Sequence, residues 1–172
     1  MRHLAPRFAS DDAWWGRAMN ANDMTGRGQA EAAGQPARIS EMLGLTAVAL
    51  DDVGLARVVA KGLQASAAEA LGAVIGRAQV VGPLIPEATL RRARQGRKAL
   101  SREMSGRLYE LSRVVDAANR SFGGDRAAVD RFLTRPHPLL DGMTPLAMAQ
   151  SGSAGADAVV NLIRRADAGV AV

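Results

Sequence analysis

The chain has 172 residues, 48% of them hydrophobic, which is enough for one core and a small second module but not for a large multidomain enzyme. Its formal net charge is +5, its sequence pI is near 10.9 and only 3% of its residues are aromatic. The absence of cysteine excludes disulfides, thiolate zinc sites and a cysteine nucleophile. Abundant alanine, leucine and arginine, without alternating β-branched runs, predict an all-α protein.

The first forty residues differ in composition from the rest. Residues 1–40 are rich in glycine, alanine and polar residues and show no sustained period, which predicts a flexible N-terminal arm. Trp14 and Trp15 interrupt this pattern, either as an incidental apolar pair or as a short turn that docks on a partner. No stretch has the roughly eighteen consecutive apolar residues of a membrane span, and no signal peptide is visible. We therefore expect a cytoplasmic protein without a membrane partner.

Three short helices are predicted after the arm. The first lies within 48–63, where apolar or small residues recur at helical spacing, namely Leu55, Val58, Val59 and Gly62. Ser66 and Glu69 have the spacing of a capping box for a second helix, which Gly76 would close. Pro86 begins a third helix, which ends at Gly96.

Basic residues concentrate around this third helix. Nine lysines or arginines and only three acids lie between Arg77 and Arg113, a local excess of six positive charges. Such a stripe suits phosphate groups, because neutralised phosphates release counterions, although a solvated helix face is the alternative. The third short helix, which carries Thr89 and three arginines, has the form of a helix-turn-helix recognition helix.

The strongest periodic signal follows Ser101 and predicts a long helix with one apolar face. That face consists of Met104, Leu108, Leu111, Val115, Ala118 and Phe122. Gly123 and Gly124 would end this helix, and Asp125 can cap the next one. The inward residues of the next helix are Val129, Phe132 and Leu133.

The segment RPHPLLDGMTPLAMA, residues 135–149, predicts a rigid corner between helices. Its first two prolines end one helix and stiffen the exit, and Leu139 and Leu140 are expected to anchor the corner in the core. The remaining elements are a turn at Asp141-Gly142 and an N-cap at Thr144 followed by Pro145. A last helix is predicted from Ser153, with Ala156, Val159, Val160 and Ile163 facing inward.

Catalytic constellations are missing from the sequence. The only histidines are His3 in the arm and His137 between two prolines, and neither is placed as a general base. GRGQAE lacks the third glycine of a dinucleotide fingerprint, and SGSAG lacks the spacing of a nucleophile elbow. We therefore predict a binding protein, not an enzyme, with no cofactor and no metal.

Several ordered motifs resemble one family. They are a proline followed by Thr-Leu and arginines at 86–92, the serine before the long helix with Arg107 and Leu111, Phe-Leu ahead of Pro136, LDGMTPL from Leu140, and the final Gly169-Val. Through them, residues 45–172 resemble the Xre/MbcA/ParS antitoxins of RES-Xre toxin–antitoxin systems. The chain departs from the family in its long arm and in Phe132, where members often have tryptophan.

This resemblance implies a fold, a function and two sets of contacts. An Xre-like helix-turn-helix domain is expected over 41–115 and a small helical toxin-binding domain over 116–172. The chain would neutralise a RES-domain toxin that degrades NAD, by blocking its active site, and would repress its own operon. The implied DNA contacts are Thr89, Arg91, Arg92, Arg94, Arg97 and Lys98, and the implied toxin contacts are Arg164, Arg165, Gly169, Val170 and Val172.

Helix-turn-helix proteins usually read paired half-sites, so the resemblance also implies a homodimer within a larger toxin–antitoxin complex. Two other functions stay open at this point. The chain could be a stand-alone transcriptional regulator whose C-terminal domain only dimerises, or a toxin-binding protein with a degenerate helix-turn-helix.

Overall fold

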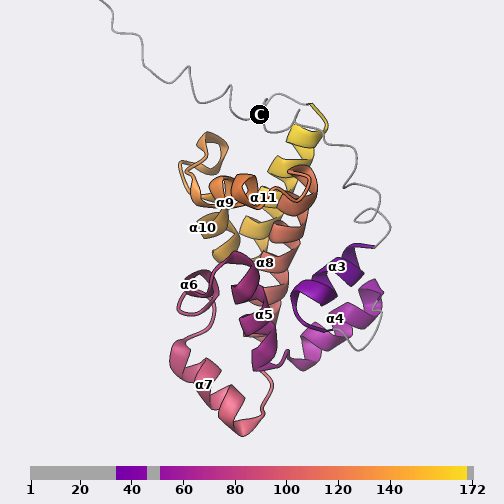
Figure 1. The fold of residues 1–172 in the computed structure, drawn as a ribbon, viewed down its shortest axis with the longest axis vertical. Coiled ribbons are helices and arrows are strands. Elements are labelled where there is room, and N and C mark those ends of the chain that lie inside the picture. The colour runs from indigo at the N-terminus through magenta and orange to yellow at the C-terminus, as the bar shows by residue number, and fades with distance from the viewer. Residues whose placement is uncertain (1–33, 46–50, 170–172) are drawn as a thin grey trace, which may run out of the picture.

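The computed structural model describes residues 34–45 and 51–169, and these residues form helices and no strand (Figure 1). In chain order the helices are α3 (Gln35–Met42), α4 (Asp52–Lys61), α5 (Ala65–Ile75), α6 (Arg77–Val80), α7 (Glu87–Gly96), α8 (Arg102–Ser121), α9 (Arg126–Thr134), the 3-10 helix η1 (Pro138–Leu140), α10 (Pro145–Gln150) and α11 (Ser153–Asp167). The all-α prediction is confirmed for this part of the chain. Trp14, Trp15, Val170 and Val172 lie outside the described residues.

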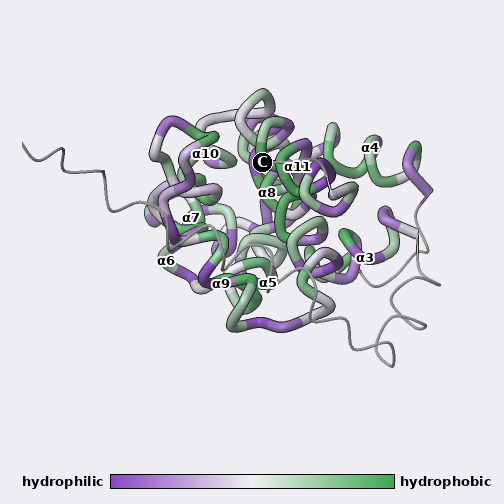
Figure 2. The backbone as a smooth tube through the Cα atoms, turned by 90° about the horizontal axis from the view of Figure 1, so that it is seen from above, coloured by the Kyte–Doolittle hydropathy of each residue, from purple (hydrophilic) through white to green (hydrophobic). Residues whose placement is uncertain are grey.

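Helix α8 is the central element. It packs against α3, α4 and α5 and also against α9, α10 and α11, and Figure 2 shows it between α3 and α4 on one side and α10 on the other. Ser101 caps it as predicted, because its side chain accepts a hydrogen bond of 3.2 Å from the Met104 backbone N–H. The predicted division of the chain at residue 115 falls inside α8, which both halves share.

The face of α8 predicted to be apolar lies in the core. Its buried members are Leu108, Leu111, Val115, Ala118 and Phe122, whereas Met104 is partly buried against the core. The ring centroids of Phe122 and Phe132 lie 5.5 Å apart, which joins the end of α8 to α9. One apolar cluster therefore runs through both halves of the chain.

An ion pair holds α3 on α8. Arg38 donates from Nε to one carboxylate oxygen of Asp116 at 2.6 Å and from Nη2 to the other at 3.0 Å. The side chain of Asp116 is only 4% exposed, and Ile39 is buried on the same helix. The predicted arm reached residue 40, but Gln35–Met42 form a helix on the core. The predicted arm therefore extends too far, because the Arg38–Asp116 pair and the buried side chain of Ile39 hold residues 35–42 on the core.

Two predictions about the short helices are wrong. Ser66 is not an N-cap: α5 begins at Ala65, and no side chain caps it. The backbone before α5 is instead fixed by Leu63, whose N–H donates to Ser105 Oγ at 2.8 Å and whose carbonyl accepts from the Leu100 N–H at 2.8 Å. Gly62 follows α4 with a φ of 102°, and a Cβ there would lie 2.5 Å from the Leu100 carbonyl oxygen. Gly62 is therefore the close-packed end of α4 and not, as predicted, a residue within the helix.

The proline corner, which we define as residues 136–145, forms as predicted except at one residue. Thr144 caps α10 by accepting from the Ala147 N–H at 3.1 Å, and Pro145 occupies the first helical position. Leu140 is buried as expected, but Leu139 is 50% exposed. The one turn of η1 directs two adjacent leucines to different sides, so only one of them reaches the core.

Candidate functional site

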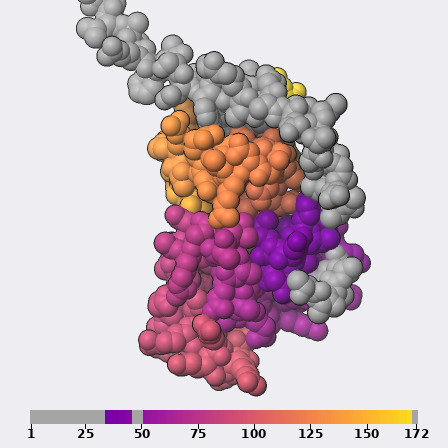
Figure 3. Space-filling view, in the orientation of Figure 1, coloured from indigo at the N-terminus to yellow at the C-terminus, as the bar shows by residue number. Residues whose placement is uncertain are grey.

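Helix α7 carries the predicted DNA contacts and projects from the rest of the fold. It packs against α5 through its buried residues Leu90 and Ala93. Figures 1 and 3 show it at one end of the molecule. Its C-cap is Arg97, a non-glycine residue in the left-handed region with a φ of 50°, after which the chain turns into α8. The helix thus presents its outward face to solvent.

Most of the predicted basic residues are exposed on α7 or on the turn that follows it. We call Arg91, Arg92, Arg97 and Lys98, all exposed, the α7 basic surface. No ion pair involves these four within the described part of the chain. Arg94 differs, since its Nη1 lies 3.1 Å from a Glu69 carboxylate oxygen on α5. Thr89 is only partly exposed.

The basic side chains run from the middle of α7 to the turn after it. The first turn holds Glu87 instead, which pairs with Arg77 at 2.6 Å. A helix that reads base edges would use its early residues, whereas exposed arginines further along hold phosphates. The arrangement of charge on α7 therefore suits backbone phosphates better than base edges.

The predicted toxin contacts within the described residues lie at the carboxyl end of α11. Arg164 and Arg165 are exposed on the last turn, whereas Val160 and Ile163 on the same helix are buried. Gly169 follows with a φ of 68° and donates its N–H to the Ala166 carbonyl at 3.0 Å. The inward face predicted for this helix is confirmed.

The two predicted contact regions lie at opposite ends of the molecule. Ser121 at the end of α8 donates from Oγ to Asp167 at 2.7 Å, so the carboxyl ends of α8 and α11 are adjacent. Helix α7 leads into the start of α8, twenty residues earlier. At 1.5 Å per residue this separation is about 30 Å. Figure 1 shows the same arrangement, with α7 at one end and the end of α11 at the other.

A polar cluster joins α8 to α11 between these ends. The Nη1 atom of Arg113 lies 2.6 Å from a Glu110 carboxylate oxygen and 3.0 Å from an Asp157 carboxylate oxygen. The guanidinium carbon of Arg113 lies 6.0 Å from the centroid of the Tyr109 ring. Burial raises the pKa of Tyr109, an effect that the nearby Arg113 charge opposes. The cluster therefore connects α8 to α11 through partly buried ion pairs.

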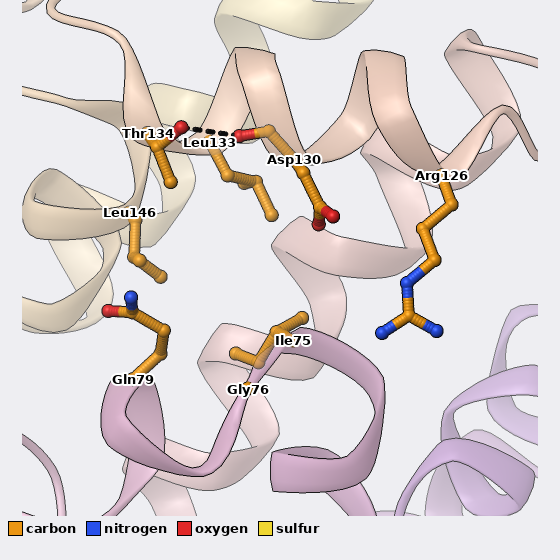
Figure 4. A pocket seen from close by; sticks show the side chains of 8 residues that line it. All are labelled: Ile75, Gly76, Gln79, Arg126, Asp130, Leu133, Thr134 and Leu146. Atoms are coloured by element: carbon orange, nitrogen blue, oxygen red, sulfur yellow. Dashed lines mark hydrogen bonds between the residues drawn. The ribbon is translucent and has the colours of Figure 1, made fainter.

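A cleft of 330 Å³ lies between the α5–α6 turn and α9–α10 (Figure 4). Its lining residues are Ile75, Gly76, Gln79, Arg126, Asp130, Leu133, Thr134 and Leu146. Two side chains bridge its walls to backbone carbonyls: Arg126 donates to Val74 at 3.0 Å, and Gln150 donates to Gln79 at 2.8 Å. These hydrogen bonds connect α9 and α10 to α5 and α6, so the cleft lies where the N-terminal and C-terminal halves of the chain meet.

Residues 34–45 and 51–169 contain no group of three or more His, Cys, Asp or Glu side chains that could hold a metal ion. In the same residues no single helix has the length and apolar content to cross a membrane, and α4 with α5 meets that test only as a pair bent by 115°.

The sequence reasoning missed two exposed apolar residues on the proline corner, Leu139 at 50% and Met143 at 39%. The signal that could have found them is the length of the turn. Only two residues, both leucines, lie between Pro138 and Asp141, and such a short segment cannot bury both of them.

Residues 117–169 match the family model of the antitoxin Xre/MbcA/ParS C-terminal toxin-binding domain. The matched segment begins in the last part of α8 and includes α9, the proline corner, α10 and α11. No curated protein and no solved structure matches the chain in the corresponding comparisons. The C-terminal part of the chain is thus similar to an antitoxin domain that binds a toxin.

Proposed function

We propose that this chain is the antitoxin of a RES-Xre toxin–antitoxin pair. Its C-terminal part would bind a RES-domain toxin that degrades NAD and block the active site, with Arg164, Arg165, Gly169, Val170 and Val172 as contacts. The observation that carries the proposal is the match of residues 117–169 to a toxin-binding domain. The exposed basic end of α11 lies inside that segment.

The N-terminal half would bind the promoter of its own operon and repress it, as a dimer in the cytoplasm. The proposed contacts are Thr89, Arg91, Arg92, Arg94, Arg97 and Lys98. The exposure of the α7 basic surface supports this role, because unpaired cations can replace phosphate counterions. Toxin and DNA would then bind at ends of the molecule about 30 Å apart, so each could bind without displacing the other.

Separation of the two activities tests the proposal. Removal of residues 165–172 should restore NAD degradation by the adjacent reading frame's product while promoter binding is kept. The double variant Arg91→Ala, Arg92→Ala should do the reverse. Growth under co-expression and NAD consumption with purified proteins would report neutralisation. If the wild-type chain neither binds that product nor protects cells from it, the antitoxin proposal is wrong.

The exposed α7 basic surface by itself would also fit a second function, a stand-alone transcriptional regulator whose C-terminal half only dimerises. A RES-type reading frame beside the gene distinguishes the two functions, since a stand-alone regulator needs none. A degenerate helix-turn-helix is distinguished by promoter binding no stronger than binding to random DNA at the same salt concentration.

A further inference from the structure

Exposed apolar side chains are unevenly distributed over the described residues. The large hydrophobic residues that are exposed there are Val53 at 55%, Leu139 at 50% and Met143 at 39%. Single exposed residues of this kind are ordinary, and Val53 on α4 is such a case. Leu139 and Met143 differ because both lie on one short turn, the proline corner.

The corner is held rigidly. The His137 N–H donates to the Met143 carbonyl at 3.0 Å, and the Gly142 and Leu140 N–H groups donate back to the His137 carbonyl at 3.2 and 3.0 Å. The His137 side chain is buried, and its Nδ1 accepts from the Leu139 N–H at 3.2 Å. Leu139 and Met143 are therefore presented by a backbone that is already ordered, which lowers the entropy lost on binding.

The backbone also contains a costly conformation at this turn. Asp141 is one of two non-glycine residues with positive φ in the described part of the chain, at 53°. Strain of this kind persists when the surroundings fix it, as the hydrogen bonds of the corner do. The exposure of Leu139 is thus fixed by the hydrogen-bonded backbone of the corner and is not the result of an irregular loop.

The corner is continuous with the segment matched to a toxin-binding domain, since residues 117–169 include all of it. In Figure 1 it lies in the same half of the molecule as the carboxyl end of α11, and α7 lies at the far end. An apolar contact on the corner and a basic contact on α11 could therefore belong to one interface.

We propose that Leu139 and Met143 form an apolar anchor that inserts into a hydrophobic depression on the toxin, beside the contacts made by the end of α11. This inference rests on the proposed antitoxin function. The anchor would bury apolar area on a turn that is already ordered, which reduces the entropy lost on binding. The basic end of α11 would lie towards the polar rim.

The test compares removal of the exposed apolar side chains of the corner with removal of an exposed apolar side chain elsewhere on the molecule. The double variant Leu139→Ser, Met143→Ser should bind the toxin encoded by the adjacent reading frame about 10- to 100-fold more weakly, mainly through faster dissociation. Val53→Ser, at the exposed apolar residue on α4, should bind like the wild type. Thermal unfolding of both variants checks that the corner stays folded, since all three residues are at least 39% exposed.

Cysteine labelling gives a second readout that does not depend on a stability change. The chain has no cysteine, so Leu139→Cys and Val53→Cys each create one labelling site. Bound toxin should slow maleimide labelling at position 139 at least tenfold and leave position 53 unchanged. Equal labelling rates at 139 with and without bound toxin would overturn the anchor.

The outcomes separate the two proposals. Wild-type binding with an unaffected double variant refutes the anchor alone, and failure of the wild-type chain to bind the toxin refutes the antitoxin function. Slower labelling at 139 in concentrated antitoxin without toxin would assign the surface to a second copy of the chain, and would also overturn the inference.

Discussion

Arg38 and Asp116 are 78 positions apart in the chain and are joined by two hydrogen bonds of 2.6 and 3.0 Å. The hydrogen bond to Asp116 raises the pKa of Arg38, so the guanidinium keeps its charge at any pH the protein meets. Because the carboxylate is buried, removal of one partner leaves the other charge without compensation. The pair makes α3 part of the fold.

Arg38→Met should therefore lower the free energy of unfolding by about 3 to 5 kcal/mol, as expected when one member of a buried pair is lost. The matched control is Glu103→Gln in the Arg107–Glu103 pair on α8, whose side chains are 45% and 75% exposed. That change should cost less than about 1 kcal/mol. Urea unfolding of both variants measures the difference, and equal losses would contradict the role given to the buried pair.

Gly155 permits the close approach of α10 and α11. A Cβ at this position would overlap the Met148 carbonyl oxygen and the Ser151 hydroxyl. Gly155→Ala should therefore destabilise the chain by about 1 to 3 kcal/mol and weaken toxin binding through displacement of α11.

Gly106 provides the control for this substitution. It lies inside α8, and a Cβ there would meet no atom within 4 Å. Gly106→Ala should stabilise the chain by about 0.5 to 1 kcal/mol, because alanine is the better helix former. A stabilising effect at both positions in thermal unfolding would contradict the packing argument for Gly155.

Removal of charge from the α7 basic surface should change the salt dependence of DNA binding. If Arg91 and Arg92 each neutralise a phosphate, the double alanine variant should lower the slope of log affinity against log salt by about 2. Arg120→Ala, at an exposed arginine on α8, is the control and should leave the slope unchanged. Fluorescence anisotropy over a series of salt concentrations measures the slope for each variant. An unchanged slope in the double variant would show that Arg91 and Arg92 do not contact DNA.

Tyr109 should titrate above the ordinary range of tyrosine. Burial raises its pKa above 10.0 in the folded chain, so the native state keeps the phenol proton at a pH where the unfolded chain has released it. Stability should therefore fall as pH rises from about 10 towards the folded pKa. The sequence contains one tyrosine, so phenolate absorbance reports this group alone.

The measurement compares native protein with protein in urea. The absorbance midpoint should lie higher in the native sample and return to about 10.0 in urea, the value of an exposed tyrosine. Identical midpoints in the two samples would show that Tyr109 is not partly buried.

Local features of the sequence predicted local structure well. The caps at Ser101, Asp125 and Thr144 each form the expected hydrogen bond to a backbone N–H three residues on. The long apolar period of α8 and the inward face of α11 are also found as predicted. These signals succeed because a cap or a helical face is specified within one or two turns of chain.

The failures share one cause. The cap predicted at Ser66 does not form. Leu63 makes backbone hydrogen bonds to Leu100 and to the Ser105 side chain, and these contacts fix the backbone just before α5 begins. Leu139 is exposed to solvent because the turn places its neighbour Leu140 in the core instead. Neither outcome depends on the nearest residues alone.

By itself the sequence determined most of the helical segments, though not α3 or α6, and where most of them end and where positive charge accumulates. The tertiary structure alone decided that α3 joins the core, that α7 and the end of α11 lie at opposite ends, and which apolar side chains stay exposed. The physical reason is range. Caps and helical periods act over a few residues, whereas burial and ion pairing depend on side chains that folding brings together from distant parts of the chain.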